Sequence, residues 1–390
     1  MNDASSSALL PTGMYDLLPP EAEAEAQVVA RLMTTLASHG YERIKPPLVE
    51  FEETLFSGAG AAMATVTFRM MDPVSHRMIG VRADMTPQIA RIAATRLADA
   101  PRPLRLSYAG QVLRATGSEL RPERQVGEVG AELIGAAGPA ADVEAIAVAG
   151  EALAALGVPH LSVDLTLPTL VPAVAEAYGI TGARATALRG ALDHKDAAAV
   201  AAVAGEAGEV LRNLLAAAGP APAALAALDR FDLPARAHAE RIRLRAVLDG
   251  LAAAAPRLMV TVDPVENRGF EYHTGISFTF FSATAGPVGE LGRGGRYSAG
   301  DAGAPEPATG FTLYTDTILR TLPAPVTPRR LLLPFGTDST RGRTLRDAGW
   351  VTVAALEQAV DWTTEALRLD CGYLLEGDEP VAVLGEARDG

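Results

Sequence analysis

The chain opens with a helical period of apolar residues. Val28, Leu32 and Leu36 recur every four residues and place an apolar stripe along a helix over residues 22–38. Gly40 follows closely, and glycine is typical of a position just beyond a helix C-terminus. The pattern therefore predicts an amphipathic helix that packs on the rest of the protein.

Strand and helix patterns then follow one another with no repeat of fixed period. We predict strands at 41–51, 66–82 (a hairpin turning at Asp72 and Pro73), 103–115, 125–135 and 161–165, and helices at 83–98 and 141–156. Pro46 and Pro47 confine the first strand to an edge or an end of its sheet. Thr86 suits the N-cap, and Pro87 the first position, of the helix that they open. These segments predict a mostly antiparallel sheet with helices packed on it.

The composition changes twice farther along the chain. Residues 174–254 consist largely of Ala, Leu and polar residues and contain no convincing strand pattern. Strand patterns return near residue 256, and the last segment alternates strand and helix after a linker that contains several prolines. We therefore expect an α+β fold of three parts: a core formed by residues 1–172 and 256–322, a helical insertion at 173–255, and a short α/β segment at 329–390.

The charge of the chain narrows the classes of function. A formal net charge of −13 and a pI near 5.0 argue against a surface that binds nucleic acid along its whole length. Lys45 and Lys195 are the two lysines, so arginine guanidinium groups must bind any carboxylate or phosphate. The glycine-rich run GRGGRY at 292–297 has neither the lysine nor the helix start of a phosphate-binding loop.

The sequence gives no sign of a membrane span, a disulfide framework or a metal site. No apolar run reaches the roughly 18 residues of a membrane helix, and the first residues lack the basic start and apolar core of a signal peptide. Cys371 is the single cysteine, and five histidines lack the spacing of metal ligands: His39, His76, His160, His194 and His238. We therefore expect a cytoplasmic protein with no metal and no cofactor.

Six groups of residues resemble the motifs of a known family, in that family's order. They are GMYDLLP at 13–19, YERIKPPLVE at 41–50, VRADMTPQIAR at 81–91, GQVLRA and GEVGAELIG at 110–115 and 127–135, RGFEYHTGISF at 268–278, and GGRY followed by GF at 294–297 and 310–311. Together they resemble class II aminoacyl-tRNA synthetases of the histidyl-tRNA synthetase family and, more closely, its paralogues, the regulatory subunits of ATP phosphoribosyltransferase. The resemblance implies a class II antiparallel sheet flanked by helices, with a helical insertion.

An amino-acid pocket is what this resemblance implies for the site. An α-carboxylate pairs with a guanidinium, an α-ammonium with carboxylates and a hydroxyl, and an imidazole with an aromatic wall and a polar partner for each nitrogen. By resemblance, Asp84 and Thr86 hold the ammonium, Glu132 binds a ring nitrogen, and Arg268 faces the carboxylate. The candidate residues for histidine binding are Asp84, Thr86, Arg114, Glu128, Glu132, Arg268, Tyr272, His273 and Tyr297.

Individual candidates also have simpler structural roles. Arg268 beside a glycine suits a surface ion pair, Tyr272 suits the core, and Glu132 suits the exposed side of an alternating strand. The occurrence of all the segments in one order favours the pocket.

The chain departs from the family's pattern where amino-acid activation would take place. Activation with ATP needs cations on the phosphates, and the resemblance implies one from motif 2 and one from motif 3. Arg114 stands at the motif 2 position, but the motif 3 position is Thr317. Arg320, three residues farther along a helix, would point about 60° away from the required direction. We therefore expect no catalytic residue in this chain.

Three further departures lie in the pocket itself. His273 replaces the second tyrosine of the family's RGLDYYTG run, Glu128 stands at a glutamine position, and Asp84 is one methylene shorter than the usual glutamate. A further carboxylate near an imidazole favours the charged ring. These changes are compatible with histidine binding at altered affinity and also with its loss.

By resemblance we predict a non-catalytic regulatory subunit that is required for the first step of histidine biosynthesis and for its feedback inhibition. The implied partners are the short-form ATP phosphoribosyltransferase catalytic subunit in a hetero-octamer, a second copy of the chain bound through motif 1, and L-histidine as effector, with no tRNA and no membrane. The 62 residues after Pro328 are too few for a full anticodon-binding domain of about 90–100 residues. An active histidyl-tRNA synthetase and a scaffold that binds no histidine remain alternatives. Histidine has two candidate places, the pocket and the subunit interface.

Overall fold

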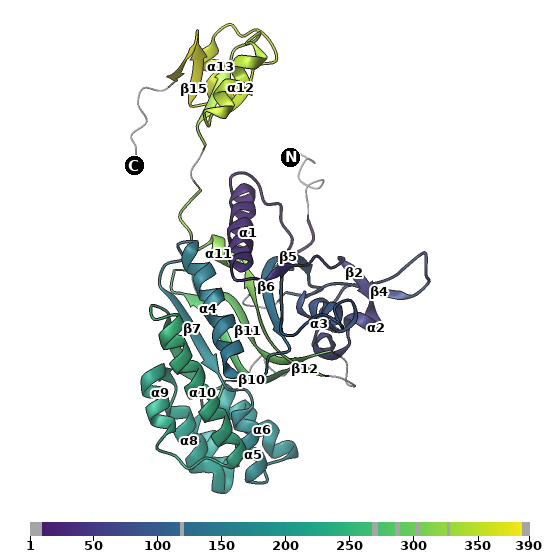
Figure 1. The fold of residues 1–390 in the computed structure, drawn as a ribbon, viewed down its shortest axis with the longest axis vertical. Helices are drawn as coiled ribbons and strands as arrows, with labels where there is room; N and C mark the ends of the chain where they lie inside the picture. Colours follow the sequence, from purple (N-terminus) through teal and green to yellow (C-terminus); the bar gives the residue numbers. More distant parts are fainter. Residues whose placement is uncertain are drawn as a thin grey trace, which may run out of the picture. The chain divides into compact units, whose positions relative to one another are not determined.

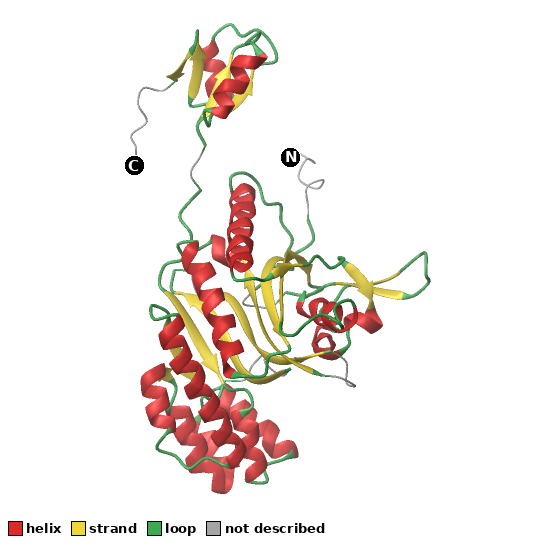
Figure 2. Cartoon of the chain, in the orientation of Figure 1, coloured by secondary structure: helices red, strands yellow, loops and turns green. Residues whose placement is uncertain are grey.

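The computed structural model describes residues 10–117, 121–266, 272–284, 289–300, 305–325 and 328–383. The chain divides into two compact units, unit 1 (Met1–Pro323) and unit 2 (Ala324–Gly390). Unit 1 contains the large sheet and most of the helices, and unit 2 contains a small sheet with two helices (Figures 1 and 2). No helix in the described ranges is long and apolar enough to cross a membrane.

A nine-stranded sheet forms the centre of unit 1 (Figure 1). Its strands lie in the order β1 (Glu42–Arg43), β5 (Leu104–Leu113), β6 (Gln125–Ile134), β12 (Glu306–Tyr314), β11 (Glu290–Ala299), β10 (His273–Ser282), β7 (Leu161–Thr166), β9 (Met259–Asp263) and β8 (Gly219–Pro220). Neighbours are antiparallel except in the pairs β1–β5 and β7–β9. The mostly antiparallel sheet predicted from the sequence is confirmed.

Helices pack on both faces of this sheet, each against a cluster of apolar strand side chains. α1 (Glu21–Ser38) and α4 (Pro139–Ala155) pack on one face and bury Leu32 with Val129 of β6. α3 (Thr86–Thr95) lies over the other face, where Ile89 joins a separate apolar cluster with Tyr108 of β5. The helix predicted from the first apolar period is confirmed, since Val28, Leu32, Met33 and Leu36 are its buried residues.

A second, three-stranded sheet contains the predicted hairpin. Its strands are β2 (Val49–Phe51), β4 (Met78–Val81) and β3 (Arg69–Met71), with α2 (Glu52–Leu55) and the 3-10 helix η2 (Gly58–Met63) following β2. Asp72 closes the turn by accepting hydrogen bonds from the backbone N–H groups of Val74 and Ser75. The prolines at 46 and 47 divide the predicted first strand into β1 and β2, which belong to different sheets.

The predicted N-cap of α3 is wrong. The helix already includes Thr86, and its N-cap position is Met85, with no side-chain capping hydrogen bond. The Thr86 hydroxyl instead lies 3.3 Å from the Tyr108 hydroxyl. Thr86 is therefore turned toward the sheet, because a tertiary partner competes with the local cap.

Helices occupy almost all of the chain between β7 and β9. They are α5 (Leu170–Ala177), α6 (Gly182–Asp193), α7 (Ala197–Ala204), the 3-10 helix η3 (Gly205–Ala207), α8 (Gly208–Ala216), α9 (Ala221–Leu228) and α10 (Ala235–Ala254). The two-residue strand β8 lies among them and pairs with β9. Leu211, Leu228 and Leu244 are fully buried in the cluster that also contains the α4 side of the large sheet.

Unit 2 is a four-stranded sheet with two helices. Its strands lie in the order β14 (Val351–Ala354), β13 (Arg330–Leu333), β15 (Tyr373–Glu376) and β16 (Glu379–Ala382), and its helices are α12 (Ser339–Asp347) and α13 (Trp362–Arg368). In the chain, α12 lies between β13 and β14, and α13 lies between β14 and β15. Leu331 and Leu332 point into two separate small cores. Cys371 lies in the second core as a buried free thiol, as expected for a small apolar side chain.

Candidate functional site

The candidate site lies on the face of the large sheet that α3 covers. Side chains alternate between the two faces along a strand, so residues two apart share a face. In β6, Val129 and Ala131 join the core on the α4 side, and Glu128 and Glu132 therefore point to the opposite side. In β11, Tyr297 belongs to the cluster on the α3 side.

A small cavity opens on this face between β6, β10, β11 and β12. Six of the predicted residues line it: Asp84, Thr86, Glu132, Tyr272, His273 and Tyr297. Its volume is about 30 Å³, which is room for one or two water molecules and less than a free histidine needs. An amino acid therefore enters only when lining side chains move.

Glu132 lies at the bottom of this cavity, 1% exposed. The Tyr297 hydroxyl donates to Glu132 Oε2 at 2.9 Å, and the Tyr108 hydroxyl donates to Oε1 at 3.4 Å. Burial raises the pKa of Glu132 to about 8, and the Asp84 carboxylate adds to this, whereas hydrogen bonds from Tyr297 and Thr86 oppose it. The carboxyl group is therefore poised to change its charge near neutral pH or to pair with a cationic ligand.

Asp84 and Thr86 are brought to the cavity by the start of α3. Asp84 Oδ1 accepts the backbone N–H of Thr86 at 2.7 Å, which fixes the carboxylate at the helix N-terminus. The Tyr108 hydroxyl lies between the Thr86 hydroxyl and the Thr312 hydroxyl of β12, and its distance to the Thr312 hydroxyl is 2.8 Å. The carboxylate and hydroxyl that an ammonium group prefers thus lie together on one wall.

Two of the predicted residues that the structure describes, Arg114 and Glu128, do not line this cavity. Arg114 Nη2 lies 3.4 Å from Glu128 Oε1, and Arg114 Nε donates to the Ala83 carbonyl oxygen at 3.3 Å. Burial and Asp84 raise the pKa of Glu128 to about 8, while Arg114 and the Met85 backbone N–H lower it. Arg268 lies outside the described residues.

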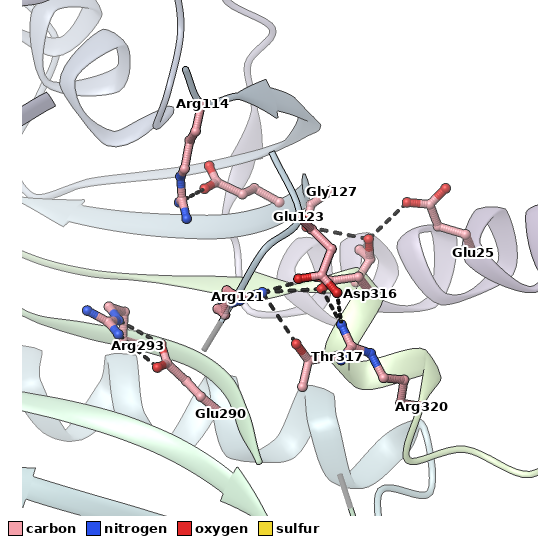
Figure 3. Close-up of polar contacts among 12 residues, drawn as sticks. Glu25, Arg114, Arg121, Glu123, Gly127, Glu290, Arg293, Asp316, Thr317 and Arg320 are labelled. Carbon is pink, nitrogen blue, oxygen red and sulfur yellow. Dashed lines mark hydrogen bonds and ion pairs between the residues drawn. The ribbon is translucent and has the colours of Figure 1, made fainter. Parts of the chain in front are cut away.

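Figure 3 shows the surroundings of the motif 3 position, Thr317, which is 2% exposed. Arg320 Nη2 points away to Glu123 and Asp316, at 3.1 and 3.0 Å. Arg121 Nη2 instead reaches the Thr317 hydroxyl at 3.3 Å and Asp316 at 3.2 Å. The expectation that Arg320 does not take the motif 3 role fits this geometry.

Sequence reasoning missed Arg121 and Tyr314 at this place. The Arg121 guanidinium lies over the Tyr314 ring, 4.0 Å from its centroid, and Tyr314 lines the cavity. Nothing in the local pattern links these residues, since they are almost two hundred positions apart. The guanidinium groups of both Arg121 and Arg320 are thus paired with carboxylates.

Sequence reasoning also missed Arg293, although a signal for it was present. Arg293, Gly295 and Tyr297 are two residues apart along β11, so the alternation that places Tyr297 in the cavity places Arg293 there too. Arg293 forms a bidentate pair with Glu290, with both N–O distances at 2.7 Å (Figure 3). GRGGRY is therefore part of a strand inside a sheet, and the prediction that it forms no phosphate-binding loop is confirmed.

The glycines of this strand have a packing role. A Cβ at Gly295 would overlap the His273 ring, and a Cβ at Gly294 would overlap the Phe278 ring and the Gly310 carbonyl oxygen. The glycines therefore let large side chains of β10 lie across β11.

The chain is similar to known proteins over nearly its whole length. The family model described as histidyl-tRNA synthetase matches residues 13–318. The chain is 59% identical over 372 residues to the ATP phosphoribosyltransferase regulatory subunit of Rhodospirillum centenum, covering 95% of each chain. It is 56% identical over 383 residues to that of Paramagnetospirillum magneticum, covering 98% of this chain and 100% of the relative.

A solved structure shares the fold. The crystal structure of an ATP phosphoribosyltransferase regulatory subunit/histidyl-tRNA synthetase from Bacillus halodurans aligns with a TM-score of 0.80 and 24% identity, over 92% of this chain and 96% of that one. At that identity the likeness supports the fold alone.

The sheet, the cavity and these likenesses define a class II aminoacyl-tRNA synthetase-like protein of the histidyl-tRNA synthetase type. Within that class, the chain belongs to the family of ATP phosphoribosyltransferase regulatory subunits. The predicted class II fold and the predicted family are both confirmed. The family also confirms the prediction of a regulatory, non-catalytic chain.

Proposed function

We propose that this chain is the histidine-sensing subunit of an ATP phosphoribosyltransferase complex in histidine biosynthesis. Histidine binds in the cavity on the α3 side of the sheet and changes the activity of a short-form catalytic subunit. A coupling free energy of about 1–3 kcal/mol between the two chains would change that activity about 5- to 150-fold. The cytoplasmic location expected from the sequence is part of this proposal.

The observation that carries the proposal is the environment of Glu132. A buried carboxyl group with two tyrosine hydroxyls on it, next to a second carboxylate at Asp84, suits a ligand with an imidazole and an ammonium group. Tyr272 and Tyr297 supply aromatic walls, with their ring centroids 6.3 Å apart. The site thus recognises both ends of a histidine molecule.

The surroundings of Thr317 support binding without activation. An ATP phosphate needs unpaired cations, and the guanidinium groups nearest Thr317 pair with Asp316 and Glu123. The buried Tyr314 ring lies under one of them. We therefore expect the cavity to bind an amino acid and to form no adenylate.

The proposed assembly is a hetero-octamer in which this chain dimerises through motif 1. A groove of about 800 Å³ lies there, with Ile44, Pro47 and Ile92 in its lining. Val49 also lines the groove and is 40% exposed, and the preceding residue, Leu48, is 59% exposed. A second copy that covers this apolar surface would lower its cost in water.

The dimer is tested by sedimentation of the purified chain. Leu48→Asp is expected to shift the chain from dimer to monomer, because a charge would enter the apolar contact. Ile242→Asp on α10, at a residue that is 56% exposed, is the matched control and should leave the dimer intact. An unchanged dimer with Leu48→Asp would move the interface elsewhere.

The regulatory function is tested by co-purifying the chain with the short-form transferase of its host and measuring inhibition by L-histidine. Glu132→Gln is expected to weaken inhibition at least tenfold, since it removes the carboxylate from a charge-assisted contact. Inhibition that is equal in both complexes would place the effector site outside the cavity. Histidine-dependent pyrophosphate exchange by the isolated chain would instead support an active synthetase.

A further inference from the structure

The cavity contains a guanidinium that the family resemblance does not assign. Arg293 lines it together with Asp84 and Glu132, so both signs of charge face one small space. A free amino acid carries an ammonium and a carboxylate on the same carbon atom. The Asp84 carboxylate and the Thr86 hydroxyl would hold the ammonium, and a guanidinium is the side chain best suited to the carboxylate.

The two arginines of the GRGGRY run differ in burial and in the face of the sheet to which they point. Arg296 points to the α4 face, keeps 5% of its side-chain surface exposed, and bonds to Asp142 and to the Ala136 and Gly138 carbonyl oxygens. Arg293 points to the cavity and keeps 38% of its side-chain surface exposed. Arg293 thus keeps more of its side-chain surface exposed than Arg296 does.

Arg293 is also held in a defined orientation. Its Nε and Nη2 donate to the two oxygens of Glu290, three residues earlier on the same strand (Figure 3). Such a planar pair fixes the plane of the guanidinium, so little side-chain entropy is lost when a second carboxylate binds. Tyr314 and Tyr272 line the same cavity as Arg293.

We propose that Arg293 binds the α-carboxylate of the amino acid in this cavity, opposite Asp84 and Thr86, and so selects a ligand with a free carboxylate. The inference rests on the proposed function, since it assumes that the cavity takes histidine. It assigns the carboxylate to a residue of β11, whereas the resemblance assigned it to Arg268.

The test is calorimetric titration of the full chain with L-histidine and with L-histidinol, in which a hydroxymethyl group replaces the carboxylate. The wild-type chain is expected to bind histidine more tightly. Arg293→Gln is expected to weaken histidine binding about 10- to 100-fold and to leave histidinol binding unchanged or slightly stronger. Arg320→Gln removes the same charge outside the cavity and should change neither affinity.

The outcomes distinguish an error in the Arg293 assignment from an error in the proposed function. Equal losses for both ligands with a folded Arg293→Gln chain would overturn the carboxylate assignment, and so would a histidine-specific loss in Arg268→Gln alone. If Arg293→Gln does not fold, Arg293→Lys decides, because it keeps the charge and should show a smaller loss for histidine only. No histidine binding by the wild-type chain, alone or in the complex, would overturn the proposed function first and this inference with it.

Discussion

Glu132 lies directly across from Gly310, its partner in the register of β6 and β12, and its carboxylate occupies the space where a side chain of Gly310 would begin. The cavity therefore depends on a residue without a Cβ as much as on the carboxylate itself.

Gly310→Ala is expected to destabilise the protein. The added Cβ would overlap the Glu132 carboxylate and approach the Ala131 carbonyl oxygen, both in a buried sheet. Overpacking of this kind costs about 1–3 kcal/mol in the free energy of unfolding, to be measured with urea. Gly190→Ala on α6, where nothing lies within 4 Å, is the control and should add about 0.5–1 kcal/mol. Equal changes in the two variants would contradict the steric argument.

Stability is expected to fall as the pH rises from about 4.5 to 8. The pKa values of Glu128 and Glu132 are raised from 4.5 to about 8, mainly by burial, so the folded chain holds protons in this range that the unfolded chain has lost. Their contribution to the free energy of unfolding is fully present below pH 4.5 and is lost as the pH rises through 8. Each group lowers this free energy by at most about 1.4 kcal/mol per pH unit. Urea unfolding at several pH values measures the slope.

Glu132→Gln should make that slope shallower, because the amide does not titrate. Glu306→Gln is a suitable control, because the hydrogen bond from Arg102 lowers the pKa of Glu306. The titration of Glu306 therefore affects stability only below about pH 4.5. A slope that does not respond to Glu132→Gln would mean that Glu132 is ionised throughout.

Asp142→Ala is expected to cost about 3–5 kcal/mol in the free energy of unfolding. Asp142, which is 1% exposed, accepts hydrogen bonds from Arg296, Arg243 and Thr309. Its removal would leave the Arg296 guanidinium buried without a carboxylate. The exposed pair of Glu176 and Arg236 provides the comparison, and Glu176→Ala should cost less than about 1 kcal/mol. Similar losses of unfolding free energy for Asp142→Ala and Glu176→Ala would show that the buried ion pairs of Asp142 do not stabilise the protein.

Thr317→Arg is not expected to create an amino-acid-activating enzyme. Thr317 is buried, Arg121 already bonds to its hydroxyl, and the Tyr314 ring lies beneath that guanidinium. A new arginine would meet an existing one instead of an ATP phosphate. Pyrophosphate exchange with ATP and histidine measures this, and exchange above the background would reopen the synthetase alternative.

Local patterns were sufficient for most of the helices and strands. The four-residue period of Val28, Leu32 and Leu36 places α1 within one residue, because burial of one helix face follows from backbone geometry alone. Thr86 shows where local reasoning fails, since its hydroxyl turns to Tyr108 across the sheet instead of capping its own helix. The prolines after Lys45 predicted an edge strand correctly, but the division into two sheets depended on pairing with β5 and β4.

The amino-acid order was enough to identify the family and to indicate residues of an amino-acid site, because motif residues keep their spacing along the chain. Only the folded chain decided that Arg121 meets Thr317 across 196 positions, and that Arg293 shares a cavity with Glu132. Strand order and register bring such residues together, and buried charges then select partners by proximity in space, which no local period records.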